Sequence, residues 1–498
     1  MRVAVVYMPV PRQPLSEVER RFSYSFFQAY AKTYFSGLPT ESLKHLWQIE
    51  RVNQGLLYIA ANLLKNGFDV SYYAFASDPY CPPRDGFSLI LHQLIEDISE
   101  IDLVCVYCIT CNYHLAETIA FQLKDRKHEL IVGLGGPHAS SLGTQVLERR
   151  TVYRDGLPHD ECRSPFDFVC IGEGEETVLE IARCLEEKGY LEPIPGMSVR
   201  RNGFVNAGSI RCRRNPVDFP IPAYEIAGVN QLPAARIFPN RGCANNCAFC
   251  ADPWRKKVTY VTLDRIAEEV ELLYSQYGTR YLYLGCEDFL YDQGRALAIA
   301  TTIHNTRSNI LWTAQCRVKP KMDSKIIDKL TKYGCVGLEF GVESAEQTIL
   351  DRVGKNILVK QAKDCFSLAK SCGIYTHAYW MLGLPGETEK SANLTISTML
   401  MWAEQGLVDT WEYKIYIPYP GTPIFANPHA YGIKVHTKDF QSYHYALDPV
   451  ISSNGLGPAE LRSIYEKGLR LSADLLQSKS GSEEIEIGVD VETIENMF

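Results

Sequence analysis

The sequence predicts an α/β protein in which an N-terminal doubly wound parallel sheet precedes a partial (β/α)6 barrel and a small C-terminal auxiliary region. Over about the first 190 residues, short apolar runs alternate with segments of helical periodicity, a pattern typical of a parallel sheet covered by helices. From residue 235 onward, the same alternation repeats as successive strand–helix units, which favours a barrel or part of one. The 498 residues suffice for about two to four domains.

The N-terminal sheet is predicted from apolar runs that are separated by amphipathic helices. Residues 53–66, for example, carry leucine, isoleucine and alanine at helical spacing, and Gly67 ends this helix. The predicted strands are 2–8, 70–75, 102–108, 129–134 and 167–171, and the predicted helices are 53–66, 87–99, 113–124 and 175–187. Ligands of such sheets bind beyond the carboxyl ends of the strands.

Three loops at those strand ends are candidate ligand-binding segments. Glycines there let a ligand approach the backbone closely, although a glycine after a strand is more often only part of a turn. The candidate residues are Thr110, Cys111, Asn112, Gly135, Gly136, Pro137, His138, Gly172, Glu173 and Gly174. The spacing of Cys105, Cys108 and Cys111 also suggests a second cluster. Because Cys105 and Cys108 fall on opposite faces of a predicted strand, a structural or cofactor-lining role is favoured.

A connector rich in proline and glycine covers residues 191–234. Within it, residues 197–201 and 204–207 flank Asn202-Gly203, a dipeptide typical of a tight hairpin turn. We therefore expect a short hairpin inside the connector, before the barrel begins.

Six strand–helix units are predicted after the connector. The strands are 236–240, 280–286, 310–316, 335–341, 376–382 and 411–417, and the helices between them are 263–276, 292–306, 323–333, 358–371 and 388–405. The C-terminal region holds one further predicted helix at 458–477. In parallel barrels the chemistry occurs at the C-terminal ends of the strands, so the residues at those ends are the candidates for a site.

Composition excludes several classes of function. The net charge of −8 gives no general electrostatic attraction to nucleic acid. No apolar run approaches the roughly 18 residues of a membrane span, and the first residues do not resemble a signal peptide. Sixteen cysteines without a secretion signal indicate a reducing compartment, so we expect a cytoplasmic protein that binds neither nucleic acid nor membrane.

Cys243, Cys247 and Cys250 follow the first barrel strand with the spacing C-x3-C-x2-C. Thiolates are the usual ligands of iron–sulfur clusters. One short loop of three cysteines can hold three irons of a [4Fe–4S] cube, which leaves the fourth iron open for another ligand. A structural zinc site needs four protein ligands, usually as two pairs, and no partner pair follows this loop.

This loop, with Phe249 as the aromatic residue before the last cysteine, resembles the C-x3-C-x-aromatic-C signature of the radical S-adenosylmethionine (SAM) superfamily. The resemblance implies that Cys243, Cys247 and Cys250 hold a [4Fe–4S] cluster and that SAM chelates the open iron. It further implies that an electron cleaves SAM to methionine and a 5′-deoxyadenosyl radical. The family's partial barrel and an electron donor such as flavodoxin or ferredoxin are also expected.

Residues 1–190 resemble the Rossmann-like cobalamin-binding domain that precedes many radical SAM barrels. The resemblance rests on one strand that ends in Gly-Gly-Pro-His-Ala and a later strand that ends in Gly-Glu-Gly-Glu. The chain lacks the Asp-x-His-x-x-Gly motif, so His138 is not assigned as a cobalt ligand. The implied units are a cobalamin-binding domain at 1–190, a linker at 191–234, a radical SAM barrel at 235–425 and an auxiliary region at 426–498.

The resemblance also implies SAM-binding residues at four later strand ends. Glu287 or Asp288 would accept from the SAM amine, and Arg317 would pair with the SAM carboxylate or with an acidic group of the substrate. Glu343 and Ser344 would contact the SAM ribose, and the backbone at Gly383 would pack against its adenine. From the residues alone, each charged group is equally well explained as a rim salt bridge or a helix cap. Tyr379, Tyr416 and Tyr419 line a substrate pocket or seal the open barrel, and the residues do not separate these alternatives.

The two-domain plan of the family implies methylation of an unactivated carbon of a small metabolite in biosynthesis. One SAM would methylate cobalt, and a second would give the radical that abstracts a substrate hydrogen. The alternative is the same radical chemistry without methyl transfer, namely cyclisation, rearrangement or sulfur insertion. A third hypothesis, a cobalamin- or redox-sensing protein, is disfavoured by the intact cysteine loop. No residue is assigned as a catalytic acid, base or nucleophile.

Overall fold

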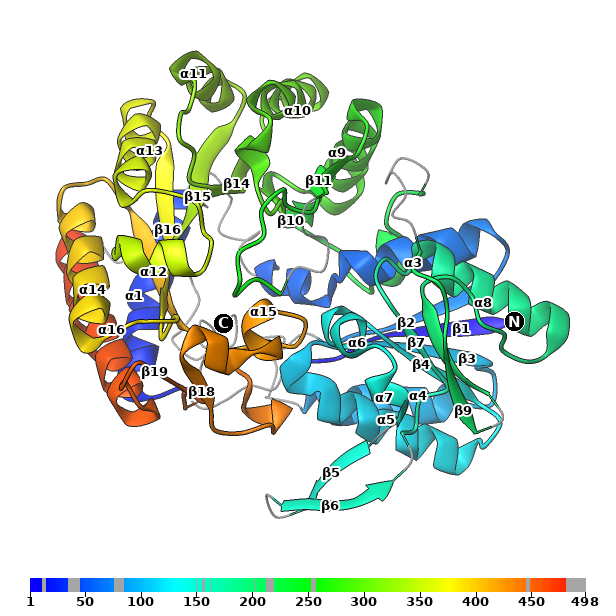
Figure 1. Ribbon diagram of the computed structural model, residues 1–498. Coiled ribbons are helices and arrows are strands. Elements are labelled where there is room, and N and C mark those ends of the chain that lie inside the picture. The colour runs from blue at the N-terminus through cyan, green and yellow to red at the C-terminus, as the bar shows by residue number, and fades with distance from the viewer. Residues whose placement is uncertain are drawn as a thin grey trace.

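Two large sheets organise the chain, one of seven strands and one of six (Figure 1). The computed structural model describes residues 1–10, 15–34, 45–75, 85–148, 150–154, 157–162, 164–201, 203–211, 219–251, 257–444 and 448–480. The seven-stranded sheet comes from the N-terminal part of the sequence, and the six-stranded sheet begins after the connector. This order confirms the predicted α/β class.

Parallel strands form the core of the first sheet. In the order of the sheet they are β2 (Asp69–Tyr73), β1 (Arg2–Tyr7), β3 (Leu103–Tyr107), β4 (Ile131–Gly135) and β7 (Phe168–Cys170). Alternate residues of β1 pack on opposite faces: Val3 and Val5 join the core that contains helices α3 (Gln54–Lys65) and α8 (Glu175–Lys188). Ala4 and Val6 join the core that contains α4 (Gly86–Asp97) and α5 (Tyr113–Arg126). The sheet is therefore doubly wound, as predicted.

An antiparallel hairpin extends this sheet beyond β7. β8 (Met197–Arg201) and β9 (Phe204–Ala207) form at the predicted residues, whereas Asn202 of the expected turn lies outside the described residues. We expected this hairpin in the linker and expected a purely parallel sheet, but β8 pairs antiparallel with β7 and makes the sheet mixed. β8 is antiparallel because residues 189–196 return the chain to the carboxyl end of β7, so that β8 starts beside the end of β7. There Ile171 N donates to Gly196 O at 2.7 Å.

The second sheet is an open barrel of parallel strands. In sheet order they are β10 (Ala234–Ile237), β13 (Tyr281–Leu284), β14 (Leu311–Arg317), β15 (Cys335–Glu343), β16 (Tyr375–Leu382) and β17 (Thr410–Ile415). The helices around it are α9 (Leu263–Tyr277), α10 (Gln293–Thr306), α11 (Ser324–Lys332), α12 (Gln347–Arg352), α13 (Val359–Ser371) and α14 (Glu389–Glu404). The predicted partial barrel is confirmed, with strand order equal to chain order.

Side-chain caps fix where the barrel helices begin. α9 begins after Thr262, which accepts a hydrogen bond from Arg265 N, and α10 begins after Asp292, which accepts one from Arg295 N. Asp323 caps α11 in the same way. Such caps satisfy backbone N–H groups that have no partner inside the helix. Local sequence therefore sets these boundaries, close to the predicted positions.

Several elements were not predicted from the sequence. They are α1 (Glu17–Tyr34), α6 (Pro137–Leu142), α7 (Gln145–Glu148), the hairpin of β5 (Arg150–Arg154) and β6 (Leu157–Cys162), and the short pair of β11 (Asn240–Arg241) and β12 (Thr259–Tyr260). The helix α1 lies early in the sequence but packs beside α16 (Pro458–Ser480) and β17 on the barrel side (Figure 1). Its Phe22 and Phe26 belong to the barrel core.

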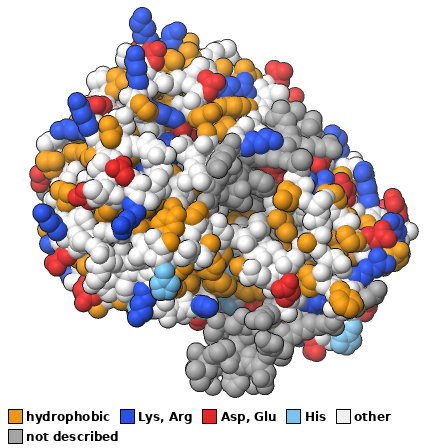
Figure 2. Space-filling model, viewed as in Figure 1, with side chains coloured by type: hydrophobic (Ala, Val, Ile, Leu, Met, Phe, Trp, Pro, Cys, Tyr) orange, Lys and Arg blue, Asp and Glu red, His pale blue; other side chains and the backbone are white. Residues whose placement is uncertain are grey.

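The C-terminal region closes against both halves of the molecule. The predicted helix at 458–477 is α16, and the region also contains α15 (Pro423–Ala426), β18 (Ile433–Val435) and β19 (Ile451–Ser453). Side chains of both charge signs are scattered over the face shown in Figure 2. Within the described ranges, no helix has both the length and the apolar character needed to cross a membrane.

Candidate active site

The cysteine loop begins directly after β11, and backbone hydrogen bonds fix its course. Gly242 N donates to Glu287 Oε2 at 2.9 Å, and Ala248 N donates to Val353 O at 2.8 Å. Gly242 has a φ of +85°, a conformation that a residue with a Cβ rarely adopts, so glycine lets the chain turn into the loop. The loop is therefore anchored to the segment after β13 and to the end of α12.

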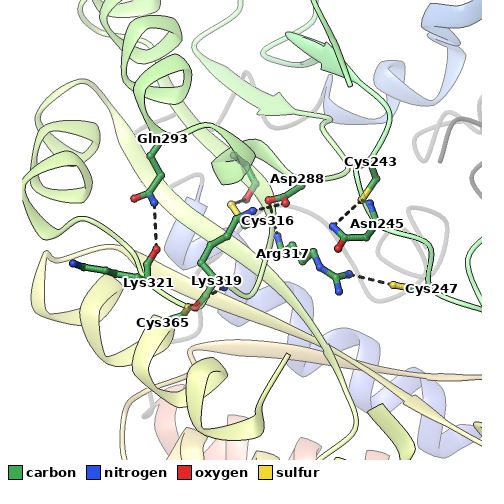
Figure 3. Close-up of polar contacts among 11 residues, drawn as sticks. Cys243, Asn245, Cys247, Asp288, Gln293, Cys316, Arg317, Lys319, Lys321 and Cys365 are labelled. Atoms are coloured by element: carbon green, nitrogen blue, oxygen red, sulfur yellow. Dashed lines mark hydrogen bonds and ion pairs between the residues drawn. The ribbon is translucent and has the colours of Figure 1, made fainter. Parts of the chain in front are cut away.

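Nitrogen donors contact two of the three cysteine sulfurs, those of Cys243 and Cys247 (Figure 3). Cys243 Sγ accepts from N and Nδ2 of Asn245 at 3.4 and 3.5 Å, and Cys247 Sγ accepts from Arg317 Nη1 at 3.2 Å. Such donors stabilise the thiolate, which is the form that binds iron. Among the described residues, no group of three or more His, Cys, Asp or Glu side chains converges on a single metal ion. In a [4Fe–4S] cube each cysteine binds a different iron, so its ligands need not converge on one point. The three cysteines, with N–H groups that donate to the sulfurs of Cys243 and Cys247, therefore fit the cube.

Arg317 brings a buried positive charge to the cysteine loop. It lies at the end of β14, only 8% exposed, and its Nη2 has no hydrogen-bond partner among the residues that the structure describes. Asp288 is 2% exposed and accepts from Arg317 N at 3.2 Å, and its other oxygen pairs with Lys319 at 2.5 Å (Figure 3). A buried N–H without a partner is costly, so the free Nη2 fits an anionic ligand such as a carboxylate.

Glu343 stands at the end of β15 in a strained backbone conformation. Its φ is +72°, and the pairing of β15 with β16 shifts register between Gly341 and Glu343. The Glu343 carboxylate forms an ion pair with Lys355 at 2.5 Å, and the two side chains are 11% and 7% exposed. Lys355 Nζ also lies 5.7 Å from the centroid of the Phe249 ring. This pair links the predicted SAM-ribose residue to the cysteine loop.

Other predicted residues of the barrel rim are packed into the protein. Ser344 is fully buried, and its Oγ lies 3.4 Å from a threonine hydroxyl of α14. Gly383 has a φ of +89°, and a Cβ at this position would lie 3.3 Å from Ile451 in β19. Tyr416 is 1% exposed after β17, whereas Tyr419 is partly buried against the same core. The structure thus gives Ser344, Gly383 and Tyr416 close packing partners.

A buried carboxyl group inside the barrel was not found from the sequence. Glu339 of β15 is 2% exposed, and its Oε2 accepts from Tyr379 Oη at 2.5 Å and from Tyr283 Oη at 3.1 Å. Burial raises the pKa of Glu339 to about 7, and the two tyrosine hydroxyls oppose that shift. Tyr379, predicted to contact substrate, therefore points at a group that can carry a proton near neutral pH.

A pocket opens at the carboxyl edge of the first sheet and encloses about 1030 Å³, its open mouth included. Of the residues predicted to bind a ligand at this sheet, those that line the pocket are Gly135, Gly136, Gly172, Glu173 and Gly174. Glu287, predicted to contact the SAM amine, also lines it. A Cβ on Gly135 would meet nothing closer than 3.9 Å, so a side chain there would extend into the pocket. Cys105, Val106 and Tyr107 of β3 also line the wall. The pocket is therefore shaped to receive a ligand over the backbone of β4, which fits a bulky cofactor such as cobalamin.

The other predicted residues of the first sheet lie away from this lining. Thr110, Cys111, Asn112, Pro137 and His138 are not among the residues that line the pocket. His138 is 1% exposed and packs between the rings of Tyr113 and Phe440, at centroid distances of 4.4 and 4.9 Å. Burial lowers the pKa of His138 to about 3, so the imidazole stays neutral in this core.

Residues from the barrel complete the wall of the pocket. Phe238, Arg241 and Glu287 line it together with the residues of the first sheet. Arg241 forms ion pairs with Glu175 at 2.7 Å and with Glu173 at 3.3 Å. Sequence reasoning missed Arg241 and Glu339 because their partners are distant in the chain. It also missed Lys355, whose partner Glu343 is only 12 residues away. Only the position of Arg241 just before the cysteine motif gave a signal.

The chain is similar to several known proteins. Residues 237–398 match the model of the Radical SAM superfamily. An uncharacterized methyltransferase of Pyrococcus horikoshii is 28% identical over 374 residues, which are 74% of this chain and 77% of that protein. The anaerobic magnesium-protoporphyrin IX monomethyl ester cyclase of Cereibacter sphaeroides is 24% identical over 424 residues, which are 81% of this chain and 64% of that protein.

Two solved structures share the fold. The radical SAM methyltransferase TsrM of Kitasatospora setae, solved with cobalamin and a [4Fe-4S] cluster, aligns with a TM-score of 0.59 and 17% identity, over 92% of this chain and 84% of that chain. The cobalamin-dependent SAM radical enzyme OxsB, solved with aqua-cobalamin and SAM, aligns with a TM-score of 0.65 and 14% identity, over 91% of this chain and 64% of that chain. At these low identities the comparison shows a shared fold, which includes both sheets.

Proposed function

We propose that this radical SAM enzyme is a cobalamin-dependent methyltransferase that acts on a small molecule in biosynthesis. The observation that carries the proposal is the wall shared by the pocket and the cysteine loop. Glu287 lines the pocket and also holds Gly242, the residue before Cys243. A cofactor in the pocket would stand next to the SAM site, as methyl transfer between the two requires. The methyltransferase relative and the cobalamin in both solved neighbours support this assignment.

Within this proposal, the residues of the chain bind and orient. Cys243, Cys247 and Cys250 would hold the [4Fe–4S] cluster, and Arg317 would pair with the carboxylate of SAM through its free Nη2. Glu343, held by Lys355, would face the SAM ribose. When bound, the reduced cluster supplies the electron that cleaves SAM to a 5′-deoxyadenosyl radical, and cobalamin carries the methyl group.

The first sheet would hold cobalamin over its glycine-rich edge. Gly135, Gly136, Gly172 and Gly174 leave the pocket without side chains at the carboxyl ends of β4 and β7. A one-electron donor such as flavodoxin or ferredoxin would reduce the cluster. Because an iron–sulfur cluster with an open iron is sensitive to oxidation, the enzyme would work in a reducing, cytoplasmic compartment.

A second candidate function is radical chemistry without methyl transfer. The cyclase of Cereibacter sphaeroides matches 81% of this chain, so a ring-forming reaction on the same scaffold has a specific observation in its favour. Methyl transfer yields S-adenosylhomocysteine and a methylated product, whereas cyclisation through a 5′-deoxyadenosyl radical yields neither of them. The products from SAM therefore separate the two functions.

The test compares the wild-type protein with Gly135→Leu, both purified without oxygen, reconstituted with iron and sulfide, and supplied with hydroxocobalamin. Leucine at this position would fill the pocket without a clash at its Cβ, so we expect cobalamin to be lost and the cluster to be kept. Gly135→Ala is the matched control, because one methyl group fits the 3.9 Å clearance. Ultraviolet–visible spectra and iron content give both occupancies.

The outcomes separate the parts of the proposal. Stoichiometric cobalamin in the wild type and in Gly135→Ala, with none in Gly135→Leu, supports the pocket assignment. A wild-type protein that keeps its cluster but retains no cobalamin would refute the methyltransferase mechanism and leave the cyclase-type reaction as the better candidate.

A further inference from the structure

We propose that Arg241 is a positioning residue that couples the N-terminal pocket to the cysteine loop, so that each site senses whether the other is filled. The inference rests on the proposed function, since it concerns the two cofactor sites named there. Arg241 lies in β11, two residues before Cys243, and its side chain reaches out of the barrel into the wall of the pocket.

Three contacts fix the guanidinium of Arg241 on the first sheet. Its Nη1 lies 2.7 Å from Glu175 Oε1 and 3.3 Å from Glu173 Oε1, and its Cζ stands 4.8 Å from the centroid of the Tyr58 ring. The side chains of Arg241, Glu173 and Glu175 are 15%, 14% and 4% exposed. Glu173 and Glu175 belong to the loop after β7 and the first turn of α8, and all four residues line the pocket. A ligand in the pocket would thus lie against the groups that hold Arg241.

A second contact joins the same pocket to the same loop. Glu287, at the end of the segment after β13, lines the pocket and accepts a hydrogen bond from Gly242 N at 2.9 Å. Gly242 lies between Arg241 and Cys243 and turns the chain with a φ of +85°. The backbone before the first cluster cysteine is therefore clamped on both sides by residues of the pocket wall.

The ion pairs of Arg241 are nearly buried, so they are sensitive to substitution. Removal of one partner leaves the other charge uncompensated and out of contact with water, which destabilises the contact. Arginine stacks on an aromatic ring and donates in a planar fork, and lysine does neither, so Arg241→Lys keeps the charge but breaks the geometry. Coupling between two sites is reciprocal, so a cluster that favours cobalamin binding is itself favoured by cobalamin to the same extent.

The experiment measures hydroxocobalamin affinity with and without the reconstituted cluster, in the wild type, Glu175→Gln, Arg241→Lys and Lys124→Met. Lys124 pairs with Asp167 at 2.6 Å at a partly buried site that does not line the pocket, so Lys124→Met is the matched control. Hydrogen–deuterium exchange of residues 240–250 is followed in the same proteins without any cofactor. This readout does not depend on activity, on SAM or on cobalamin.

We expect the cluster to tighten hydroxocobalamin binding about fivefold or more in the wild type and in Lys124→Met. In Glu175→Gln and Arg241→Lys the ratio should fall to near unity, and residues 240–250 should exchange faster although Glu175 lies in the other half of the molecule. A ratio that persists in these variants, or the same loss in Lys124→Met, overturns the inference.

A protein that binds no hydroxocobalamin in any form contradicts the proposed function, and the exchange data then decide the inference by themselves. Faster exchange at residues 240–250 in Glu175→Gln, but not in Lys124→Met, supports the bridge. Unchanged exchange in Glu175→Gln refutes it.

Discussion

Replacement of Lys355 by methionine tests whether the strained end of β15 is built for SAM. Lys355 and Glu343 form an ion pair at 2.5 Å with side chains 7% and 11% exposed, so the variant leaves a buried carboxylate without its partner. Removal of one partner of a buried pair costs about 3–5 kcal/mol. The φ of +72° at Glu343 stores about a further 1–3 kcal/mol of strain that the pair helps to hold in place.

The expected result has two parts. Denaturant unfolding of Lys355→Met should show a loss of about 3 kcal/mol, and anaerobic equilibrium dialysis should show SAM binding weakened about 10- to 100-fold, equal to about 1.4–2.8 kcal/mol. Lys355→Arg keeps the charge and should lose less in both measurements. Iron content should remain close to wild type, because Lys355 forms its ion pair with Glu343, and its Nζ lies 5.7 Å from the centroid of the Phe249 ring.

The control is Lys332→Met, which removes a lysine from an exposed pair with Asp328, side chains 68% and 55% exposed. Water screens exposed pairs, and they contribute little to stability, so this variant should retain both stability and SAM affinity. If Lys355→Met binds SAM as tightly as Lys332→Met does, the reasoning that the pair positions Glu343 for SAM is wrong. A stability loss without a change in SAM affinity would assign the pair to the fold alone.

Three further predictions follow from the site. Cys247→Ser should abolish the cluster, measured as loss of iron and of the visible absorbance, because only two thiolates then remain in the loop. Arg317→Gln should keep most of the iron but weaken SAM binding about 10- to 100-fold, since a charge-assisted bond is worth about 1.5–3 kcal/mol, and dialysis checks this. The Glu339 pKa is raised from 4.5 to about 7, so the folded state holds its proton more tightly and stability should fall as pH rises from about 4.5 to about 7; Glu339→Gln should flatten that part of the melting-temperature profile. A decline that is unchanged in Glu339→Gln would contradict the last reasoning.

Local patterns in the sequence determined most secondary structure, and they predict three candidate cluster ligands. Helices such as α9 and α10 begin at the caps Thr262 and Asp292, and caps act over one turn, so their sequence is sufficient to place them. The three thiols of the C-x3-C-x2-C motif lie within one loop, and their spacing alone predicts a common role. The glycines of the pocket were also found from local sequence, because they follow apolar runs that hydrophobic periodicity identifies as strands.

Only the tertiary structure decided which side chains meet across the two sheets. Arg241 and Glu175 are 66 residues apart, and their pairing depends on how the first sheet packs on the barrel. His138 and Gly135 lie in one predicted loop, yet the turn into α6 sends His138 toward Tyr113 and leaves Gly135 at the pocket. Helix α1 packs on β17 and α16, which lie hundreds of residues later in the chain. Contacts between distant segments depend on packing and loop closure, which no short stretch of sequence encodes.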